Sequence, residues 1–502
     1  MKRAKGLCSV RMMFAVTSFL VITALHVMRI NVSVVMAIIA RANHSQAIEG
    51  HVMNSTSHLC PDRHSLQTDR DGNASEHSTS QDAKFQWSSH LQELLLGAFY
   101  MGYCVAMVPA GYLADRFGGK WIMTVGLMVS SLMNILTPLA VESHVAFFFV
   151  TRFISGVAET TSFPAASTLV TKWAPENERT KMTLLIVSGT SFGTASGLAL
   201  AGLVCSRLGW ASSFYIFGSC TLLLAVLWCF VIYEEPSQHP CISAGERHII
   251  ETQRCRKTND EDKPSIPMCA ILTSLRAAAF NVVMVTLAGF VIFTLMTNIP
   301  LFLRHILKLD TINIGLFGAL PYGTMFLSMV LTSCLSDHVI HFNYLTTTQT
   351  RKLMINIGAI VAAGSLIAVP HVGCSHRFVI TLMSTGICGI GVTFSGIFVN
   401  AQDLAPRFNG TVFAVGNCLS VASGFIGPIA VGFITEDQTD PKGWRVVFYT
   451  TAVLSLVGAA FFQLFGSGEV QAWALSPDER ESKENYDNKD KSRDGDPTKT
   501  RV

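Results

Sequence analysis

The stretch Gly111–Trp121 reads GYLADRFGGKW. It lies between two apolar runs, 91–114 and 121–140, so we interpret it as a turn between two helices. Its glycines permit a tight turn and close helix approach. Asp115 and Arg116 place opposite charges at one helix end. The stretch therefore predicts a charged turn that can act as a latch, meaning a contact that holds in only one conformation.

The composition of the chain is that of a membrane protein. Of its 502 residues, 50% are hydrophobic and only 14% are charged, whereas a soluble domain carries about 25% charged residues. The net charge of +3 is too small to indicate a nucleic-acid partner. The 13 cysteines include no C-x-x-C pair, so neither a metal centre nor a redox centre is expected.

Twelve apolar runs are long enough to cross a bilayer, which takes about 20 residues as a helix. They are 12–40, 91–114, 121–140, 145–172, 182–206, 212–233, 275–303, 312–336, 353–370, 377–400, 411–434 and 445–467. We therefore expect an all-α membrane protein with an N-terminal six-helix bundle over 1–233 and a C-terminal six-helix bundle over 275–467. The polar segment 234–274 would join them in the cytosol, and the charged tail 468–502 would be disordered and cytosolic.

Lysine and arginine indicate the orientation, because they concentrate on the cytosolic side. They cluster at the N-terminus, in the 2–3 turn, in the 4–5 loop and in the central loop: Lys2, Arg3, Lys5, Arg11, Arg116, Lys120, Lys172, Arg179, Lys181, Arg247, Arg254, Arg256, Lys257 and Lys263. An even number of spans places these segments and the C-terminus on one side. We assign that side to the cytosol.

The long loop 41–90 falls on the opposite side. It holds three N-x-[ST] triplets, at Asn43, Asn54 and Asn73, which we interpret as glycosylation sites. Two cysteines, Cys60 and Cys374, also fall in predicted outer loops, where a disulfide between them is one possibility and two free thiols are the other.

Charged residues inside the spans point to function. Span 4 carries Arg152 and Glu159, seven residues apart and about 10 Å apart along a helix, too far to neutralise each other directly. Span 1 carries Arg29, with His26 one turn before it. An arginine at membrane depth must face a bundle interior or an aqueous cavity, and its paired donors suit a carboxylate or phosphate. Arg29 is thus a ligand for an anionic substrate, a structural partner of Glu159, or each in turn.

The latch stretch resembles the signature G-x-L-a-D-r-x-G-x-K of the major facilitator superfamily. Gly111, Asp115, Arg116 and Gly118 occupy its positions, and SCLSDH with Asp337 is a weaker copy after span 8. A motif repeated at the same place in each half is what an internal duplication predicts. The resemblance implies two pseudo-symmetric six-helix bundles.

Within that superfamily the chain resembles the anion–cation symporter family, with its sialin, vesicular glutamate and sodium–phosphate branches. The similar stretches are RINVSV (29–34), RFISGVAETTSFPA (152–165), WAPENERTK (173–181), LTTTQTRK (345–352) and NAQDLAPRFNG (400–410). Three positions depart from particular branches: Ser155 replaces a second acid, and Leu96 and Ala288 replace the histidine and arginine of the glutamate branch.

The resemblance implies a secondary active transporter of small organic anions such as sialic acid, glutamate or urate, coupled to protons or sodium by alternating access. Arg29, Arg152 and Asn417 would bind the anion, and Glu159 and His26 would couple protons. The alternative for His26 is a satisfied core histidine, as a lone histidine on an apolar helix face usually is. A sodium-dependent phosphate cotransporter and an anion channel are the alternatives. We expect no enzymatic activity, no cofactor besides the coupling ion, a monomer, and a location in the plasma membrane or a lysosomal or vesicular membrane.

Overall fold

The computed structural model describes residues 9–39, 85, 87–253, 268–373 and 375–475. The described first half contains α1 (Val10–Ile39), α2 (Ser89–Phe117), α3 (Gly119–Ser143), α4 (Val145–Glu159), α5 (Ser162–Trp173), α6 (Glu176–Leu208) and α7 (Trp210–Val231). The connecting segment contains η1 (Pro236–Gln238), α8 (Ala244–Gln253) and α9 (Met268–Thr273). The second half contains α10 (Leu275–Val283), η3 (Met284–Val291), α11 (Ile292–His305), α12 (Thr311–His341), α13 (Thr347–Ala368), η4 (Val369–His371), α14 (His376–Leu404), η5 (Pro406–Phe408), α15 (Asn409–Ile434), α16 (Pro441–Phe465) and η6 (Ala472–Ala474).

The described helices match the predicted spans one for one. In the part of the chain that the structure describes, ten helical segments are long and apolar enough to cross a membrane, and α2 and the α4–α5 pair account for the other two predicted spans. The predicted span 145–172 is not one helix, because it breaks at Thr160 and Thr161. The hydroxyl of Thr160 donates to the carbonyl oxygens of Gly156 (2.9 Å) and Tyr103 (2.8 Å), which fixes the break against α2. The predicted span 275–303 also contains an irregularity, the π-helical η3.

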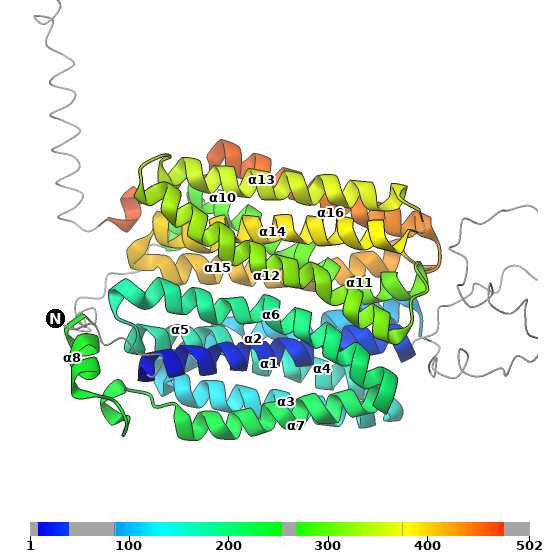
Figure 1. Ribbon diagram of the computed structural model, residues 1–502, viewed down its shortest axis with the longest axis horizontal. Helices are drawn as coiled ribbons and strands as arrows, with labels where there is room; N and C mark the ends of the chain where they lie inside the picture. The colour runs from blue at the N-terminus through cyan, green and yellow to red at the C-terminus, as the bar shows by residue number, and fades with distance from the viewer. Residues whose placement is uncertain (1–8, 40–84, 86, 254–267, 374, 476–502) are drawn as a thin grey trace, which may run out of the picture.

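The two halves form two layers of helices that run along the long axis of the molecule (Figure 1). One layer holds α1 to α7, and the other holds α10 to α16. The start of α1, the helix α8 and η6 lie at the same end of the bundle. We call this the inner end and the opposite one the outer end. The inner end is the end that the sequence assigns to the cytosol.

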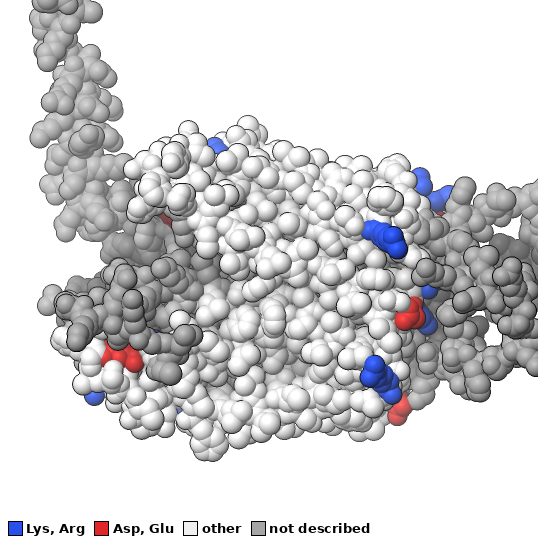
Figure 2. All heavy atoms as spheres, in the orientation of Figure 1, with Lys and Arg blue, Asp and Glu red and all other residues white. Residues whose placement is uncertain are grey.

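The surface has the apolar belt of a protein that crosses a bilayer. Leu223, Leu331 and Ile360 are 62%, 67% and 62% exposed, which is unusual for large apolar side chains facing water. Figure 2 shows that the charged side chains on one face lie toward the two ends and that its broad middle has almost none. The chain is therefore a multi-pass membrane protein.

The connecting segment, predicted as a polar loop, is partly helical and packs on the inner end. The Glu246 carboxylate of α8 accepts hydrogen bonds from the backbone N–H groups of Val10 (3.3 Å) and Arg11 (3.1 Å) and pairs with the Arg11 guanidinium at 3.0 Å. A carboxylate at a helix N-terminus satisfies free N–H groups and favours the helix dipole. Glu246 thereby fastens α8 to the start of α1.

At the outer end the two halves meet directly. Ser89 of α2 donates to the Thr435 carbonyl at 2.7 Å, and the Gln438 amide donates to Gln92 of α2 at 3.1 Å. Between α6 and α12, a Cβ on Gly202 would lie 2.7 Å from the Cα of Gly315, so only glycines permit this approach. We call these contacts the outer gate, and it is closed.

The predicted glycosylation sites Asn43, Asn54 and Asn73, and both Cys60 and Cys374, lie outside the described residues. We expect that replacing the three asparagines with glutamine collapses the expressed protein to one faster-migrating band. Peptide N-glycosidase should shift the wild-type band and leave the variant unchanged. A triple variant that migrates like the wild type would contradict either glycosylation or the assigned orientation.

Candidate functional site: a buried ion pair beside a central cavity

Glycines bring the charged helices together. A Cβ on Gly156 of α4 would lie 1.9 Å from the Phe99 carbonyl oxygen of α2, so the two helices touch through their backbones. In the same way, a Cβ on Gly126 of α3 would lie 2.1 Å from the Thr161 hydroxyl at the α4–α5 break. Small residues allow such close packing in membranes. As a result, Glu159 at the end of α4 faces both α1 and α3.

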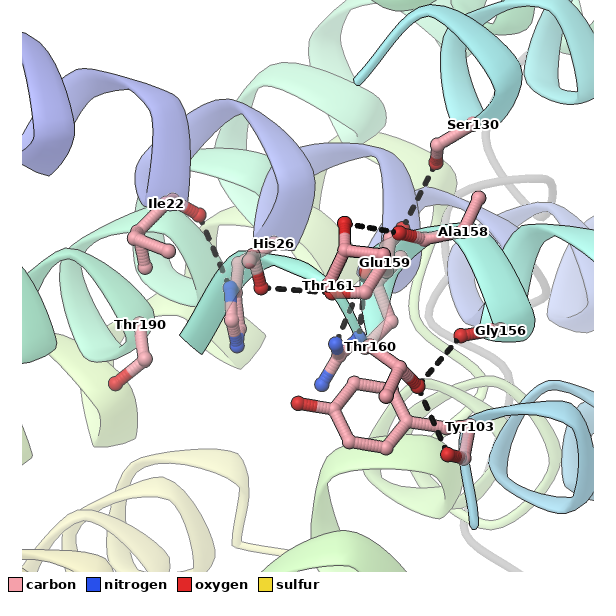
Figure 3. Close-up of polar contacts among 12 residues, drawn as sticks. Ile22, His26, Tyr103, Ser130, Gly156, Ala158, Glu159, Thr160, Thr161 and Thr190 are labelled. Atoms are coloured by element: carbon pink, nitrogen blue, oxygen red, sulfur yellow. Dashed lines mark hydrogen bonds and ion pairs between the residues drawn. The ribbon is translucent and has the colours of Figure 1, made fainter. Parts of the chain in front are cut away.

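The sequence-predicted residues Arg29 and Glu159 form an ion pair. The Arg29 guanidinium donates to one Glu159 carboxylate oxygen through Nη2 at 2.9 Å and through Nε at 3.2 Å. Ser130 of α3 donates to the other oxygen at 3.3 Å (Figure 3). Arg29 is 9% exposed and Glu159 is 2% exposed. Each charge therefore removes much of the cost of burying the other.

Arg152 lies nearby and is not paired. It is 5% exposed, its Nε is buried without a hydrogen-bond partner, and within the described part of the chain it makes no ion pair. Its guanidinium carbon lies 5.1 Å from the Phe99 ring centroid, and that of Arg29 lies 4.4 Å from the same ring. The ring face attracts both cations. The site thus holds two buried positive charges and one buried carboxylate, which leaves it with an excess of positive charge.

A central cavity lies between the halves. Its empty space is about 850 Å³, including the part open to solvent. Half of its lining residues are aromatic or methionine, and several of the others are polar: His26, Arg29, Tyr100, Tyr103, Phe163, Val187, Thr190, Ser191, Thr194, Met284, Ala288, Ile292, Phe293, Met296, Tyr322, Met325, Phe394, Phe398, Phe413, Asn417, Ser420 and Val421. Arg29 is on the wall, whereas Arg152 and Glu159 lie behind it.

Two weaker candidates also reach the cavity. His26 is on the wall, and one of its ring nitrogens, Nδ1, lies 3.0 Å from the Ile22 carbonyl oxygen, so that nitrogen is satisfied within α1. Asn417 on α15 lies on the wall from the second half, with its amide nitrogen 3.5 Å from the Met107 sulfur of α2. The cavity therefore has polar contributions from both halves, as alternating access around one site requires.

The predicted latch is described only in part, since the side chains of Asp115 and Asp337 are outside the described atoms. Gly118 has φ +89°, a conformation that favours glycine, and forms the turn between α2 and α3. Among the described atoms, none lies within 4 Å of a Cβ position on Gly111, so the structure describes no close helix approach there. Arg116 donates to the Tyr112 hydroxyl at 3.1 Å.

Glu234, which follows α7, contacts this turn and is a residue that the sequence analysis did not single out. Its carboxylate accepts from the backbone N–H groups of Gly119 (3.2 Å) and Lys120 (2.9 Å) at the start of α3 and pairs with Lys172 of α5. A Cβ on Gly118 would lie 2.6 Å from this carboxylate. The Glu234 carboxylate therefore accounts for Gly118, where a side chain would collide with it, and for Lys172, which pairs with it. Its signal in the sequence was its position directly after a span.

The second half also has an ion pair at its inner end. Arg351 at the start of α13 donates to Asp403 at the end of α14 and to Ser336 at the end of α12, both at 2.8 Å. An ion pair at the inner end therefore joins α5 to the segment after α7 in the first half, and α13 to α14 in the second half.

We expect Glu234→Gln to lower the free energy of unfolding by about 2 kcal/mol, because it loses charge-assisted hydrogen bonds to a helix N-terminus and to Lys172. None of these groups lies on the wall of the described cavity, so KM for transport should not change. Thermal unfolding of the detergent-solubilised protein measures the effect. Glu235→Gln is the matched control, since the Glu235 carboxylate lies farther from Lys172, at 3.9 Å, and should cost less. Equal losses in the two variants would contradict this role.

Two helical halves around a central charged cavity define an integral membrane protein of the secondary-transporter class. The family model of the Major Facilitator Superfamily matches residues 8–428. The chain is 30% identical to sialin of Homo sapiens over 470 residues, covering 93% of this chain and 92% of that protein. It is 30% identical to the sodium-dependent phosphate transport protein 3 of Mus musculus over 490 residues, covering 94% and 97%. It is 29% identical to the vesicular glutamate transporter 2.1 of Danio rerio over 446 residues, covering 88% and 74%.

The fold is also similar to the crystal structure of a bacterial homologue of the human lysosomal transporter Spinster in an inward-facing, unoccupied conformation. The TM-score is 0.68 at 15% identity, and the match covers 94% of this chain and all of that one. The chain belongs to the Major Facilitator Superfamily and, within it, to the anion–cation symporter group. Proteins of this family are membrane transporters, not enzymes.

Proposed function

We propose that this protein is a proton-coupled secondary transporter of small organic anions. The observation that carries the proposal is the position of Arg29, which lies on the cavity wall while its guanidinium is bound to Glu159 behind the wall. An anion that enters the cavity competes with Glu159 for the same donors. Once Arg29 turns to the anion, Glu159 is left buried with less positive charge beside it, and a buried carboxylate without a partner takes up a proton. Anion binding and proton binding then favour each other.

The cavity wall supports an organic anion over inorganic phosphate. Phosphate needs many hydrogen-bond donors around its oxygens, and Arg29 is the single arginine or lysine on the wall of the described cavity. Tyr100, Tyr103 and Phe413 instead offer ring faces and edges to an apolar or planar body. The site fits one acidic group next to Arg29 and a carbon skeleton against the aromatic side chains.

Uptake into proteoliposomes tests the proposal. Sialic acid, glutamate, urate and phosphate are supplied in turn, under proton, sodium and voltage gradients that are imposed separately. We expect saturable accumulation of at least one organic anion when the proton gradient alone is present, and no accumulation of phosphate. Uptake driven by sodium alone would favour the phosphate cotransporter. Current that follows voltage without substrate would identify a channel.

A further inference from the structure

Glu93 on α2 is a buried carboxylate with no assigned role. It is 1% exposed, and neither carboxylate oxygen has a hydrogen-bond partner among the described residues. It lies at the outer gate, since it follows Ser89 and Gln92 by one turn or less and packs on α15 of the second half. A Cβ on Gly432 of α15 would lie 3.1 Å from the Glu93 Cβ and 3.2 Å from its Cγ. The closed gate therefore encloses Glu93.

The polar side chain that faces Glu93 from the second half is Asn298 of α11, itself 2% exposed. Its Nδ2 already donates to the Thr294 carbonyl at 3.1 Å and to the Thr297 hydroxyl at 3.0 Å. Its Oδ1 is buried and has no donor. The Glu93 carboxylate and the Asn298 side chain are thus neighbours, and both have buried oxygen atoms that accept no hydrogen bond in the described part of the chain. An unsatisfied buried acceptor is costly, and an unpaired buried charge more so.

The ionisable groups around Glu93 give its carboxylate neither a hydrogen bond nor an ion pair in the described part of the chain. His90 lies about one turn earlier on α2, and its ring packs on Phe433 of α15 with centroids 4.6 Å apart. Four other groups lie at the ends of neighbouring helices: Arg304 and His305 at the end of α11, and Glu436 and Asp437 after α15. Arg29 and Arg152 lie against Phe99, which is six residues and about 9 Å farther along α2. None of them hydrogen-bonds or ion-pairs with Glu93 in the described part of the chain.

We propose that Glu93 is a proton-binding site that controls the outer gate. In the closed gate the carboxyl is protonated, and its O–H donates to the Asn298 Oδ1, so a single proton satisfies both acceptors. When the gate opens, water reaches Glu93 and the proton returns to the outer solution. Closure therefore takes up one proton from the outer side and opening releases it. Acid on the outer side favours closure, and neutral or alkaline solution favours opening.

This inference does not depend on the substrate or on Glu159, so it can fail or stand separately from the proposed function. Spin labels at Arg207 and Lys442, exposed outer-end positions in the first and second halves, report the gate by their separation. They are attached in nanodiscs through non-natural residues, so the native cysteines stay untouched. The distance distribution is recorded without substrate from about pH 5 to about pH 8, a range over which one linked proton changes an equilibrium by up to tenfold per pH unit.

For the wild type we expect a single short distance at the acidic end and a growing long-distance fraction as the pH rises. Glu93→Gln and Glu93→Met, neutral at every pH, should keep the short distance throughout. Glu436→Gln, the same change at an exposed outer carboxylate, should respond like the wild type. A pH response that persists unchanged in both Glu93 variants overturns the proposal. So does a wild-type gate that ignores pH and closes on adding sodium at constant ionic strength, which would make this a sodium site.

Discussion

Arg29→Ala is expected to abolish uptake, with a loss on the order of a hundredfold or more. The substitution removes the one arginine on the cavity wall and leaves Glu159 buried without the donors that hold it at 2.9 and 3.2 Å. Initial rates of uptake into proteoliposomes measure the effect, normalised to the amount of reconstituted protein. Arg207→Ala, an arginine exposed at the outer end, is the matched control and should transport like the wild type.

Arg29→Lys separates charge from geometry. A lysine keeps the positive charge but presents an ammonium group, which cannot offer the paired, planar donors of a guanidinium. We therefore expect this variant to fail as well, although it can still pair with Glu159 and fold. Wild-type uptake by Arg29→Lys would show that Arg29 acts only through its charge. Wild-type uptake by Arg29→Ala would remove it from the binding site altogether.

Glu159→Gln should abolish uphill accumulation driven by a proton gradient while sparing exchange of substrate for substrate. Glutamine keeps the shape of the side chain and can accept a hydrogen bond from Arg29, but it can neither hold a negative charge nor bind and release a proton. The transporter should then change between its inward-facing and outward-facing conformations only with substrate bound, which permits exchange but not net uptake. Two assays on one preparation measure this: proton-driven accumulation of the anion, and counterflow of labelled anion into vesicles loaded with unlabelled anion.

The matched control for this variant is Glu142→Gln, which changes an exposed carboxylate at the outer end of α3 and should leave both assays unchanged. If Glu159→Gln still concentrates the anion in response to a proton gradient, Glu159 is a structural partner of Arg29 and the coupling proton binds elsewhere. If both accumulation and counterflow are lost, the variant is defective in binding or folding, and its thermal unfolding distinguishes the two.

The sequence was sufficient for the fold because hydropathy and cation placement act locally along the chain. Each of the twelve predicted spans contains a described helix, and GYLADRFGGKW lies at the α2–α3 turn as expected. The break after Glu159 was not predictable in the same way. Thr160 and Thr161 suit a helix in a bilayer, and the break depends on the Tyr103 carbonyl of another helix.

At the candidate site, too, the sequence does not determine which side chains pair. Sequence spacing showed that Arg152 and Glu159 could not neutralise each other, and it proposed Arg29 as one partner. It could not show that Arg29 takes Glu159 while Arg152 stays unpaired, because that depends on how α1, α2 and α4 are rotated about their axes. The same reason applies to Glu93, which in the sequence is one acid near the start of a span. Its lack of a donor becomes visible only when α11 and α15 are packed against it.

The most direct test of the central claim, that an anion and Glu159 compete for Arg29, is the number of protons taken up when the anion binds. The anion that proteoliposomes accumulate is added to weakly buffered, detergent-solubilised protein with a pH-indicator dye, near neutral pH. We expect the wild type and Glu93→Gln to take up as much as about one proton per anion bound. Glu159→Gln should bind the anion and take up none. Binding without proton uptake in the wild type, or equal uptake in Glu159→Gln, would contradict the claim.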